Sequence, residues 1–140
     1  MAQKVRDVMT PTPVAVVPSQ AVSEAARAMR DYGIGAVLVV DNDQLKGIAS
    51  DRDIVIRAIA AGKDPDRTPV SEVCSADLIT ITPDEDAETA VLQMRQRGVR
   101  RMPVVDDRRH PVGMLSIGDL AIARDERSAL ADISAQPPNS

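Results

Sequence analysis

Aromatic residues are nearly absent from this chain of 140 residues, which has one tyrosine and neither phenylalanine nor tryptophan. Proteins that bind single-stranded nucleic acid commonly stack the bases on aromatic side chains, and this chain lacks them. Lysine and arginine are spread along the sequence, and the formal net charge is −4. No basic stripe of the kind that binds nucleic acid or an anionic membrane is present, so we expect neither partner.

Cysteine and histidine each occur once, as Cys74 and His110. One cysteine cannot form an internal disulfide or a cysteine-rich metal cage, and we predict no metal site. Cys74 follows Val73 in an apolar setting, which favours an inert, partly buried thiol over a redox sensor. His110 lies in a charged turn that ends at Pro111, which favours a solvated loop residue over a metal ligand or a general base.

Long apolar runs are also missing. No segment approaches the roughly 20 apolar residues of a membrane span, and residues 1–7 carry charge where a signal peptide would be apolar. We therefore expect a cytoplasmic protein. The composition, 44% apolar and 27% charged, is that of a globular domain whose core is built from Val, Ile, Leu, Ala and six Met.

The chain contains an internal repeat. A shift of 65 residues aligns Val8 with Val73, Pro18 with Pro83, Ala25 with Ala90, Met29 with Met94 and Gly33 with Gly98. Past the hairpin turn the shift becomes 66, because the turn of the second repeat is one residue longer. The sequence thus predicts a first repeat at 1–62, a polar linker at 63–69, a second repeat at 70–127 and a frayed tail at 128–140.

Each repeat has the pattern strand, helix, strand, strand, helix. The expected elements of the first repeat are a strand at 14–17, a helix at about 20–31, a hairpin of strands at 36–40 and 45–49, and a helix from Ser50 to about Ala60. Ser19 is the predicted N-cap of the first helix, and Gly33 its predicted end. One repeat alone buries little surface, so we predict an α/β (α+β) fold in which the two repeats pack with pseudo-twofold symmetry.

One phrase occurs in both repeats, as Gly47-Ile48-Ala49-Ser50-Asp51-Arg52-Asp53 and as Gly113-Met114-Leu115-Ser116-Ile117-Gly118-Asp119. Each copy places a serine where a strand gives way to a helix N-terminus, whose free N–H groups and positive dipole end suit a phosphate. The alternative is a capping box, in which the serine oxygen accepts from the helix and the acid bonds back to the cap. A single copy favours capping, whereas two copies in matching settings shift the balance toward a ligand.

These features, together with the hairpin phrase Arg101-Met102-Pro103-Val104-Val105-Asp106, resemble the cystathionine β-synthase (CBS) domain family. The resemblance covers about Val5 to Arg124 and implies two tandem β-α-β-β-α CBS repeats, which together form a Bateman module. It also implies a regulatory site for an adenosine-containing ligand, namely AMP, ADP, ATP or S-adenosylmethionine, and no catalytic cofactor. In the family the aspartate binds the ribose hydroxyls, and a carboxylate accepts two hydrogen bonds from a vicinal diol well.

The resemblance further implies that each ligand site draws on both repeats. One site would consist of Ser50, Asp53, Ile79, Thr80, Arg100, Arg101, Met102 and Pro103, and the other of Ser116, Asp119, Val14, Ala15, Ala36 and Val37. Arg100 and Arg101 have Gly35 and Ala36 as counterparts, so an anionic nucleotide should prefer the site of Asp53. The alternative for both arginines is a solvated strand edge. Leu38 stands where the family usually has proline, which weakens the case for the site of Asp119.

The implied function is that of a non-catalytic ligand sensor, which we expect to form a homodimer through the helices at about 20–31 and 85–97. A function from another class is that of an adaptor that binds an unidentified protein target without a nucleotide. An enzyme is not expected, because the sequence pairs no nucleophile with a base, and Asp53 and Asp119 fall in different sites.

Overall fold

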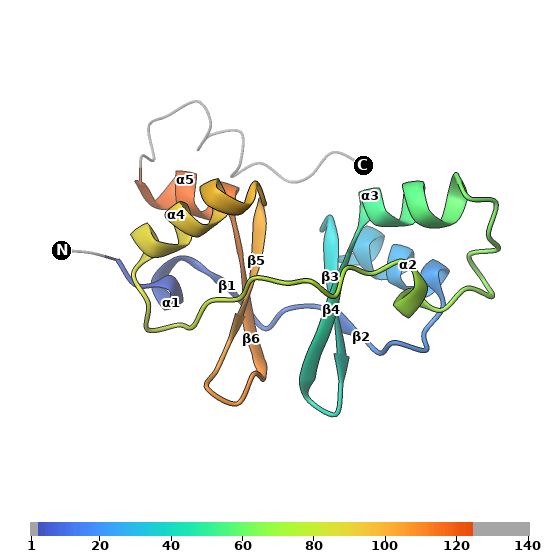
Figure 1. The fold of residues 1–140 in the computed structure, drawn as a ribbon, viewed down its shortest axis with the longest axis horizontal. Coiled ribbons are helices and arrows are strands. Elements are labelled where there is room, and N and C mark those ends of the chain that lie inside the picture. The colour runs from blue at the N-terminus through green and yellow to red at the C-terminus, as the bar shows by residue number, and fades with distance from the viewer. Residues whose placement is uncertain (1–2, 125–140) are drawn as a thin grey trace. The chain divides into compact units, whose positions relative to one another are not determined.

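The structure, a computed structural model, describes residues 3–124 of the chain. It divides into two compact units (Figure 1). We call residues 14–78 the middle unit, and residues 3–13 with 79–124 the terminal unit. Each unit contains its own three-stranded sheet and accompanying helices, which confirms the predicted α+β class. The predicted tail at 128–140 lies outside the described residues.

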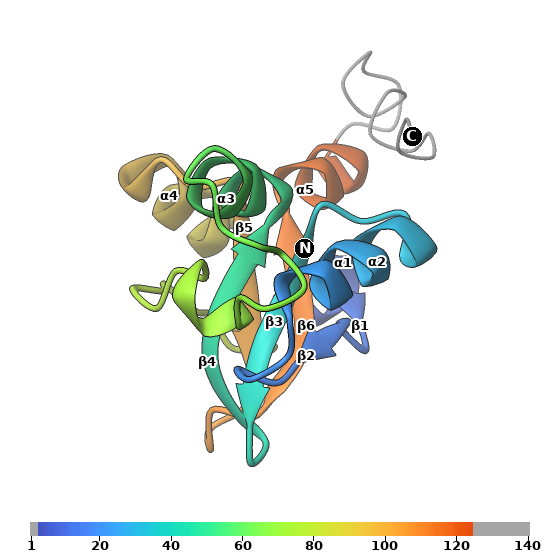
Figure 2. The same cartoon turned by 90° about the vertical axis from the view of Figure 1, so that its right-hand side faces the viewer.

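The sheet of the middle unit has the strand order β2-β3-β4. β2 (Ala15–Val16) runs parallel to β3 (Ala36–Asp41), and β3 runs antiparallel to β4 (Gln44–Ser50). Figure 2 shows β3 and β4 side by side, as the predicted hairpin. Its turn residues Asn42 and Asp43 have φ of 51° and 61°, the backbone conformation of a two-residue type I′ turn.

Two helices complete the middle unit. α2 (Val22–Tyr32) connects β2 to β3 and ends at Gly33, whose φ of 64° confirms the predicted left-handed stop. α3 (Asp51–Ile54) follows β4, but it continues as a π-helix, η1 (Val55–Ile59), where the sequence predicts uninterrupted α-helix. π segments of this kind are often found at functional sites.

The start of α2 differs from the prediction. Ser19 is not its N-cap, because the helix begins at Val22 and has no side-chain cap. Instead, the N–H of Val22 donates to the carbonyl of Thr68 at 2.8 Å, and the N–H of Ser23 donates to that of Pro65 at 2.9 Å. The free N–H groups of the helix are therefore satisfied by backbone more than forty residues away, which a local pattern does not reveal.

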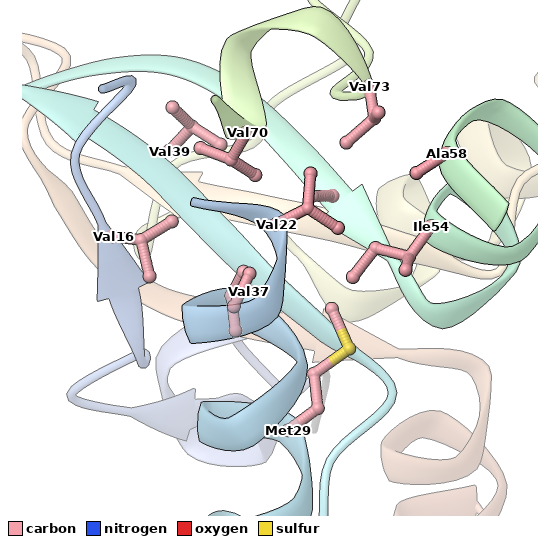
Figure 3. Close-up of a cluster of buried hydrophobic side chains, with 11 residues drawn as sticks. Val16, Val22, Met29, Val37, Val39, Ile54, Ala58, Val70 and Val73 are labelled. Carbon is pink, nitrogen blue, oxygen red and sulfur yellow. The ribbon is translucent and has the colours of Figure 1, made fainter. Parts of the chain in front are cut away.

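The core of the middle unit lies between its helices and one face of its sheet (Figure 3). It is made of small aliphatic side chains and one methionine: Val16, Val22, Ala25, Met29, Val37, Val39, Ala49, Ile54, Ala58, Val70 and Val73. Val70 belongs to a short 3-10 helix, η2 (Val70–Glu72), that follows the predicted linker. These side chains pack without any aromatic ring, as the composition requires.

The sheet of the terminal unit has the order β1-β6-β5 and is antiparallel throughout. Its strands are β1 (Thr10–Pro11), β6 (Pro111–Ser116) and β5 (Arg101–Val105). Val104 pairs with Gly113 as Val39 pairs with Gly47 in the middle unit, so the two hairpins have equivalent registers. The first strand of the second repeat is reduced to a parallel bridge between Ile81 and Val104.

Three helices pack with this sheet: α1 (Val5–Val8), α4 (Ala87–Arg97) and α5 (Ile117–Arg124). Their core consists of Val5, Ile81, Ala90, Met94, Met102, Val104, Leu115 and Leu120. No helix within residues 3–124 is long and apolar enough to cross a membrane.

The leading segments of the two repeats are exchanged between the units. Val5, at the start of the first repeat, is fully buried in the core of the terminal unit. Val70, its counterpart at the shift of 65, is fully buried in the core of the middle unit. Each hydrophobic core is therefore completed by the leading segment of the other repeat. The repeat boundaries read from the sequence stay a prediction, and the compact units do not coincide with them at these two segments.

Candidate functional site

Both copies of the repeated phrase form capping boxes. The N–H of Asp53 donates to Oγ of Ser50 at 3.0 Å, and the N–H of Ser50 donates to Oδ2 of Asp53 at 2.9 Å. Ser116 and Asp119 repeat the arrangement, at 3.1 and 2.9 Å. The capping interpretation is confirmed for both serines. In each box one carboxylate oxygen of the aspartate is engaged, and the other takes no part.

We call the point where the last strand of a repeat gives way to its last helix, at Ser50 or Ser116, the junction of that repeat. The strand register places the first strand of each hairpin beside the junction of the same repeat. Ala36 pairs with Ser50 and Val37 with Ala49, while Arg101 pairs with Ser116 and Met102 with Leu115. The two repeats also share the next backbone hydrogen bond. The N–H of Asp51 donates to the carbonyl of Gly35, and the N–H of Ile117 donates to the carbonyl of Arg100, both at 2.9 Å. The middle unit thus contains six of the predicted site residues, and the terminal unit contains the other eight. Their combination across the repeats stays a prediction.

The predicted site residues differ in how far their side chains reach the surface. Val37 and Met102 are fully buried in the two cores, so they can meet a ligand only through their backbone. Ala36 and Pro103 are also buried; Val14, Ser50, Asp53, Ile79, Thr80, Ser116 and Asp119 are partly buried; Ala15, Arg100 and Arg101 are exposed. The side chains best placed to contact a ligand are therefore the polar ones at the junctions and the two arginines.

The two aspartates differ in their ion pairing. Oδ1 of Asp53, the oxygen left free by the capping box, lies 3.8 Å from Nη1 of Arg57. The position that corresponds to Arg57 in the second repeat is Ala123, and Asp119 has no ion pair within the described part of the chain. The charge of Asp53 is partly compensated at its own helix, whereas no cation of the described residues does the same for Asp119.

Arg57 is a residue of the site that sequence reasoning missed. Its Nη1 donates to the carbonyl of Val73 at 3.0 Å and lies 3.3 Å from Oγ of Ser75, so it ties the second leading segment to the first junction. The signal in the sequence was the spacing of four between Asp53 and Arg57, which places an acid and a base on one helix face.

The first strands of the repeats differ at one hydrogen bond. In the middle unit the N–H of Leu38 donates to the carbonyl of Val14 at 3.0 Å. Pro103, the counterpart of Leu38, has no N–H to give, and no backbone donor among residues 3–124 bonds to the carbonyl of Ile79. The two candidate sites therefore present different backbone groups at equivalent positions.

Cys74 and His110 lie apart from any cluster of ligating side chains. Within residues 3–124 no group of three or more His, Cys, Asp or Glu could hold a metal ion. Burial raises the pKa of the Cys74 thiol. His110 is a half-buried turn residue whose Nδ1 lies 3.6 Å from Oδ2 of Asp106.

Comparison with known proteins identifies the family. A model of the CBS domain matches residues 5–59 and 70–126. The CBS domain-containing protein YhcV of Bacillus subtilis is 41% identical over 136 residues, which is 94% of this chain and 96% of that protein. Hypoxic response protein 1 of Mycobacterium tuberculosis is 32% identical over 117 residues, which is 83% of this chain and 81% of that protein.

Solved structures agree. The crystal structure of Hypoxic Response Protein I with two coordinated zinc ions has a TM-score of 0.77 and 31% identity, over 85% of this chain and 97% of that one. The CBS domain pair of protein MJ0100, in complex with 5′-methylthioadenosine and S-adenosyl-L-methionine, has a TM-score of 0.80 and 26% identity, over 88% of this chain and 100% of that one. Because the family model matches twice and covers most of the sequence, this chain belongs to the CBS domain family and contains a pair of CBS domains.

Proposed function

We propose that the chain is a non-catalytic regulatory module that binds an adenosine-containing ligand, namely AMP, ADP, ATP or S-adenosylmethionine. The observation that carries the proposal is the pair of junctions in which Asp53 and Asp119 are each held through Oδ2 by the serine backbone. The other oxygen of each carboxylate is outside the box and can accept hydrogen bonds from a ribose. The related MJ0100 domain pair binds two compounds that contain adenosine.

The capping role of these residues supports the ligand role. A carboxylate that is already fixed by its own backbone loses little side-chain freedom when it accepts a ligand hydroxyl, and this lowers the entropic cost of binding. At the first junction the N–H groups of Asp51, Arg52 and Asp53 already donate to Gly35, to Oδ1 of Asp51 and to Ser50, so a ligand phosphate there needs other donors. A bound ligand regulates only if it has different affinities for two arrangements of the protein.

The proposal is tested by isothermal titration calorimetry of the nucleotide-free protein with AMP, ADP, ATP and S-adenosylmethionine. GMP serves as the control, because it keeps the ribose and phosphate and changes only the base. Micromolar binding of one adenosine compound, with at least about tenfold weaker binding of GMP, is the expected result. If no adenosine compound binds, the adaptor function becomes the better interpretation, and a protein target is then sought.

We also propose that the module forms a homodimer through its helices. α4 and α5 border an apolar groove of ≈ 340 Å³, lined by Val91, Met94, Arg95, Val99, Ile117, Leu120 and Ala121. The middle unit presents apolar side chains on its π-helix η1, where Val55, Ile56 and Ile59 are all about half exposed. Association with a second copy would remove these side chains from water. Sedimentation equilibrium should give twice the mass of one chain, and Val91→Asp should reduce it to that of one chain.

A further inference from the structure

A second pocket of the terminal unit has a polar lining. It has a volume of ≈ 330 Å³ and is lined by Ile79, Thr80, Gln93, Gln96 and Arg97. The wall consists of the C-terminal half of α4 on one side and of Ile79 and Thr80, which precede the bridge at Ile81, on the other. One guanidinium, two carboxamides and one hydroxyl are groups that donate hydrogen bonds to oxyanions, and none of the described residues that line the pocket is acidic.

The charge around this pocket is one-sided. Residues 93–101 include four arginines, Arg95, Arg97, Arg100 and Arg101, and no acidic residue. None of the four makes an ion pair with another residue of the described range. In a chain of net charge −4, four arginines without an ion pair among the described residues give a local positive field that attracts anions.

The first repeat provides an internal comparison. At the shift of 65, the counterparts of the polar lining residues Thr80, Gln93, Gln96 and Arg97 are Ala15, Ala28, Asp31 and Tyr32. Asp31 pairs with Arg30, so this region of the middle unit already has its charge balanced. The same backbone framework therefore carries one cationic and three neutral hydrogen-bonding side chains in one repeat, and two alanines, an aspartate and a tyrosine in the other. Packing of the shared fold does not account for the difference, because these side chains are partly or fully exposed in both units.

We propose that the Thr80–Arg97 pocket, made by Thr80, Gln93, Gln96 and Arg97, binds a phosphate group. The phosphate is that of a free anion or that of the nucleotide in the proposed function, and the second case rests on that function. Arg97 supplies the charge and a planar pair of donors, and the two glutamines and Thr80 supply neutral donors. In the second case the pocket selects phosphorylated adenosine compounds over uncharged ones.

The test compares Arg97→Gln with Arg95→Gln. Both variants remove one positive charge from α4, but Arg95 lines the apolar groove and not the polar pocket. Wild type and both variants are titrated with ATP, with adenosine and with pyrophosphate, and amide chemical shifts are followed by NMR at Thr80 and Gln96. Arg97→Gln should weaken binding of ATP and pyrophosphate by about tenfold or more, because hydrogen bonds to charged groups are among the stronger ones. Arg95→Gln should change it less than about threefold.

The outcomes separate this inference from the proposed function. If adenosine and ATP bind wild type equally well, Arg97→Gln changes neither, and pyrophosphate gives no shifts at Thr80 and Gln96, the pocket does not bind phosphate, although the adenosine site stands. If pyrophosphate binds with shifts at Thr80 and Gln96, adenosine does not bind, and ATP binds no more tightly than pyrophosphate, the pocket binds a free anion and the proposed function fails. Equal losses in Arg97→Gln and Arg95→Gln would reduce the effect to overall charge and overturn the site, as would the absence of any response to pyrophosphate and ATP.

Discussion

Gly47 lies directly against the backbone of Ser75. A Cβ atom on Gly47 would stand 2.9 Å from the carbonyl oxygen of Ser75 and 3.0 Å from Sγ of Cys74. Ser75 is also hydrogen-bonded to β4. The N–H of Ile48 donates to the carbonyl of Ser75 at 3.0 Å, and the N–H of Ser75 donates to the carbonyl of Ile48 at 2.9 Å. The glycine that opens the repeated phrase is thus explained by the close approach of the second leading segment, without reference to a ligand.

Replacement of Gly47 should therefore destabilise the fold. Gly47→Ala is expected to lower the free energy of unfolding by about 1–3 kcal/mol, because the carbonyl of Ser75 cannot move aside without shifting the backbone that is hydrogen-bonded to β4. Gly113→Ala should destabilise the fold as well, since a Cβ atom there would stand 2.6 Å from Sδ of Met9 and 3.0 Å from the carbonyl oxygen of Thr10. Urea denaturation monitored by circular dichroism measures both. A Gly47→Ala protein as stable as wild type would show that the leading segment does not lie on β4 as described.

The serine N-caps give a second stability test. Ser50→Ala and Ser116→Ala should each lose about 1 kcal/mol, because each removes the acceptor of an aspartate N–H at a helix start. Ser19→Ala is the matched control: it changes the same side chain, and α2 starts without it. Its free energy of unfolding should stay within about 0.5 kcal/mol of wild type. If Ser19→Ala lost as much free energy of unfolding as Ser50→Ala, Ser19 would be the N-cap of α2 after all, as the sequence predicted.

Local signals in the sequence predicted the parts of the fold that depend on local chemistry. Gly33 ends α2 and Ser50 caps α3, because left-handed glycines and side-chain caps act within a few residues of themselves. The predicted start of α2 was wrong, because the first N–H groups of the helix donate to the carbonyls of Thr68 and Pro65, which are remote in sequence. The exchange of leading segments was missed for the same reason, since only the folded chain reveals which core buries Val5.

Part of the candidate site could also be predicted from the sequence. Ser50 and Asp53 lie where the repeated phrase places them, because their mutual hydrogen bonds span only three residues. Arg57 was missed, although its spacing from Asp53 is visible in the sequence, because its contact with Val73 is not local. The side chain of Met102 faces the core, a consequence of strand alternation, which a resemblance between phrases does not specify by itself.

The turn of the second hairpin should respond to acid. The N–H groups of His110 and Arg108 donate to Oδ1 of Asp106 at 2.8 and 2.9 Å and hold the pKa of this carboxyl below its ordinary value. A carboxyl whose pKa is lowered by folding stabilises the protein above its unfolded pKa, and this contribution is lost as the pH falls through the folded pKa.

The window for Asp106 therefore lies below about pH 4. The free energy of unfolding of wild type should fall more steeply than that of Asp106→Asn between pH 5 and the acid limit of folding, because the variant has no proton to bind at this position. Chemical denaturation at a series of pH values measures both slopes. Parallel slopes would contradict the assignment, as would an NMR titration that places the Asp106 carboxyl at or above its ordinary pKa.

Cys74 should be a slow nucleophile. Burial is the main reason that the pKa of the Cys74 thiol is raised, and the carboxylate of Asp53 adds to the increase. A hydrogen bond from the backbone of Cys74 and the charge of Arg57 act in the opposite direction. Because the thiolate is the reactive form, alkylation by iodoacetamide should rise with pH at a midpoint above that of the same cysteine in urea. Asp53→Asn should lower the midpoint of the folded protein. A folded midpoint below the unfolded one would contradict this description of the thiol.

In the proposed function, Asp53 and Asp119 contact a ligand in addition to capping their helices. The most direct test is calorimetric titration with AMP of wild type, Asp53→Asn, Asp119→Asn and the double variant. Asparagine keeps the side-chain oxygen that accepts from the serine N–H, but it loses the charge and one acceptor. Glu85→Gln is the control, because Glu85 accepts from the N–H of Thr82 at 2.9 Å in the same spacing and lies outside both junctions.

We predict that the double variant binds AMP at least about tenfold more weakly than wild type while it keeps its fold, as the loss of charge-assisted hydrogen bonds requires. Asp53→Asn should account for more of this loss than Asp119→Asn, and Glu85→Gln should bind as wild type does. If the double variant binds AMP with wild-type affinity, the two carboxylates are caps and nothing more, and the claim is wrong.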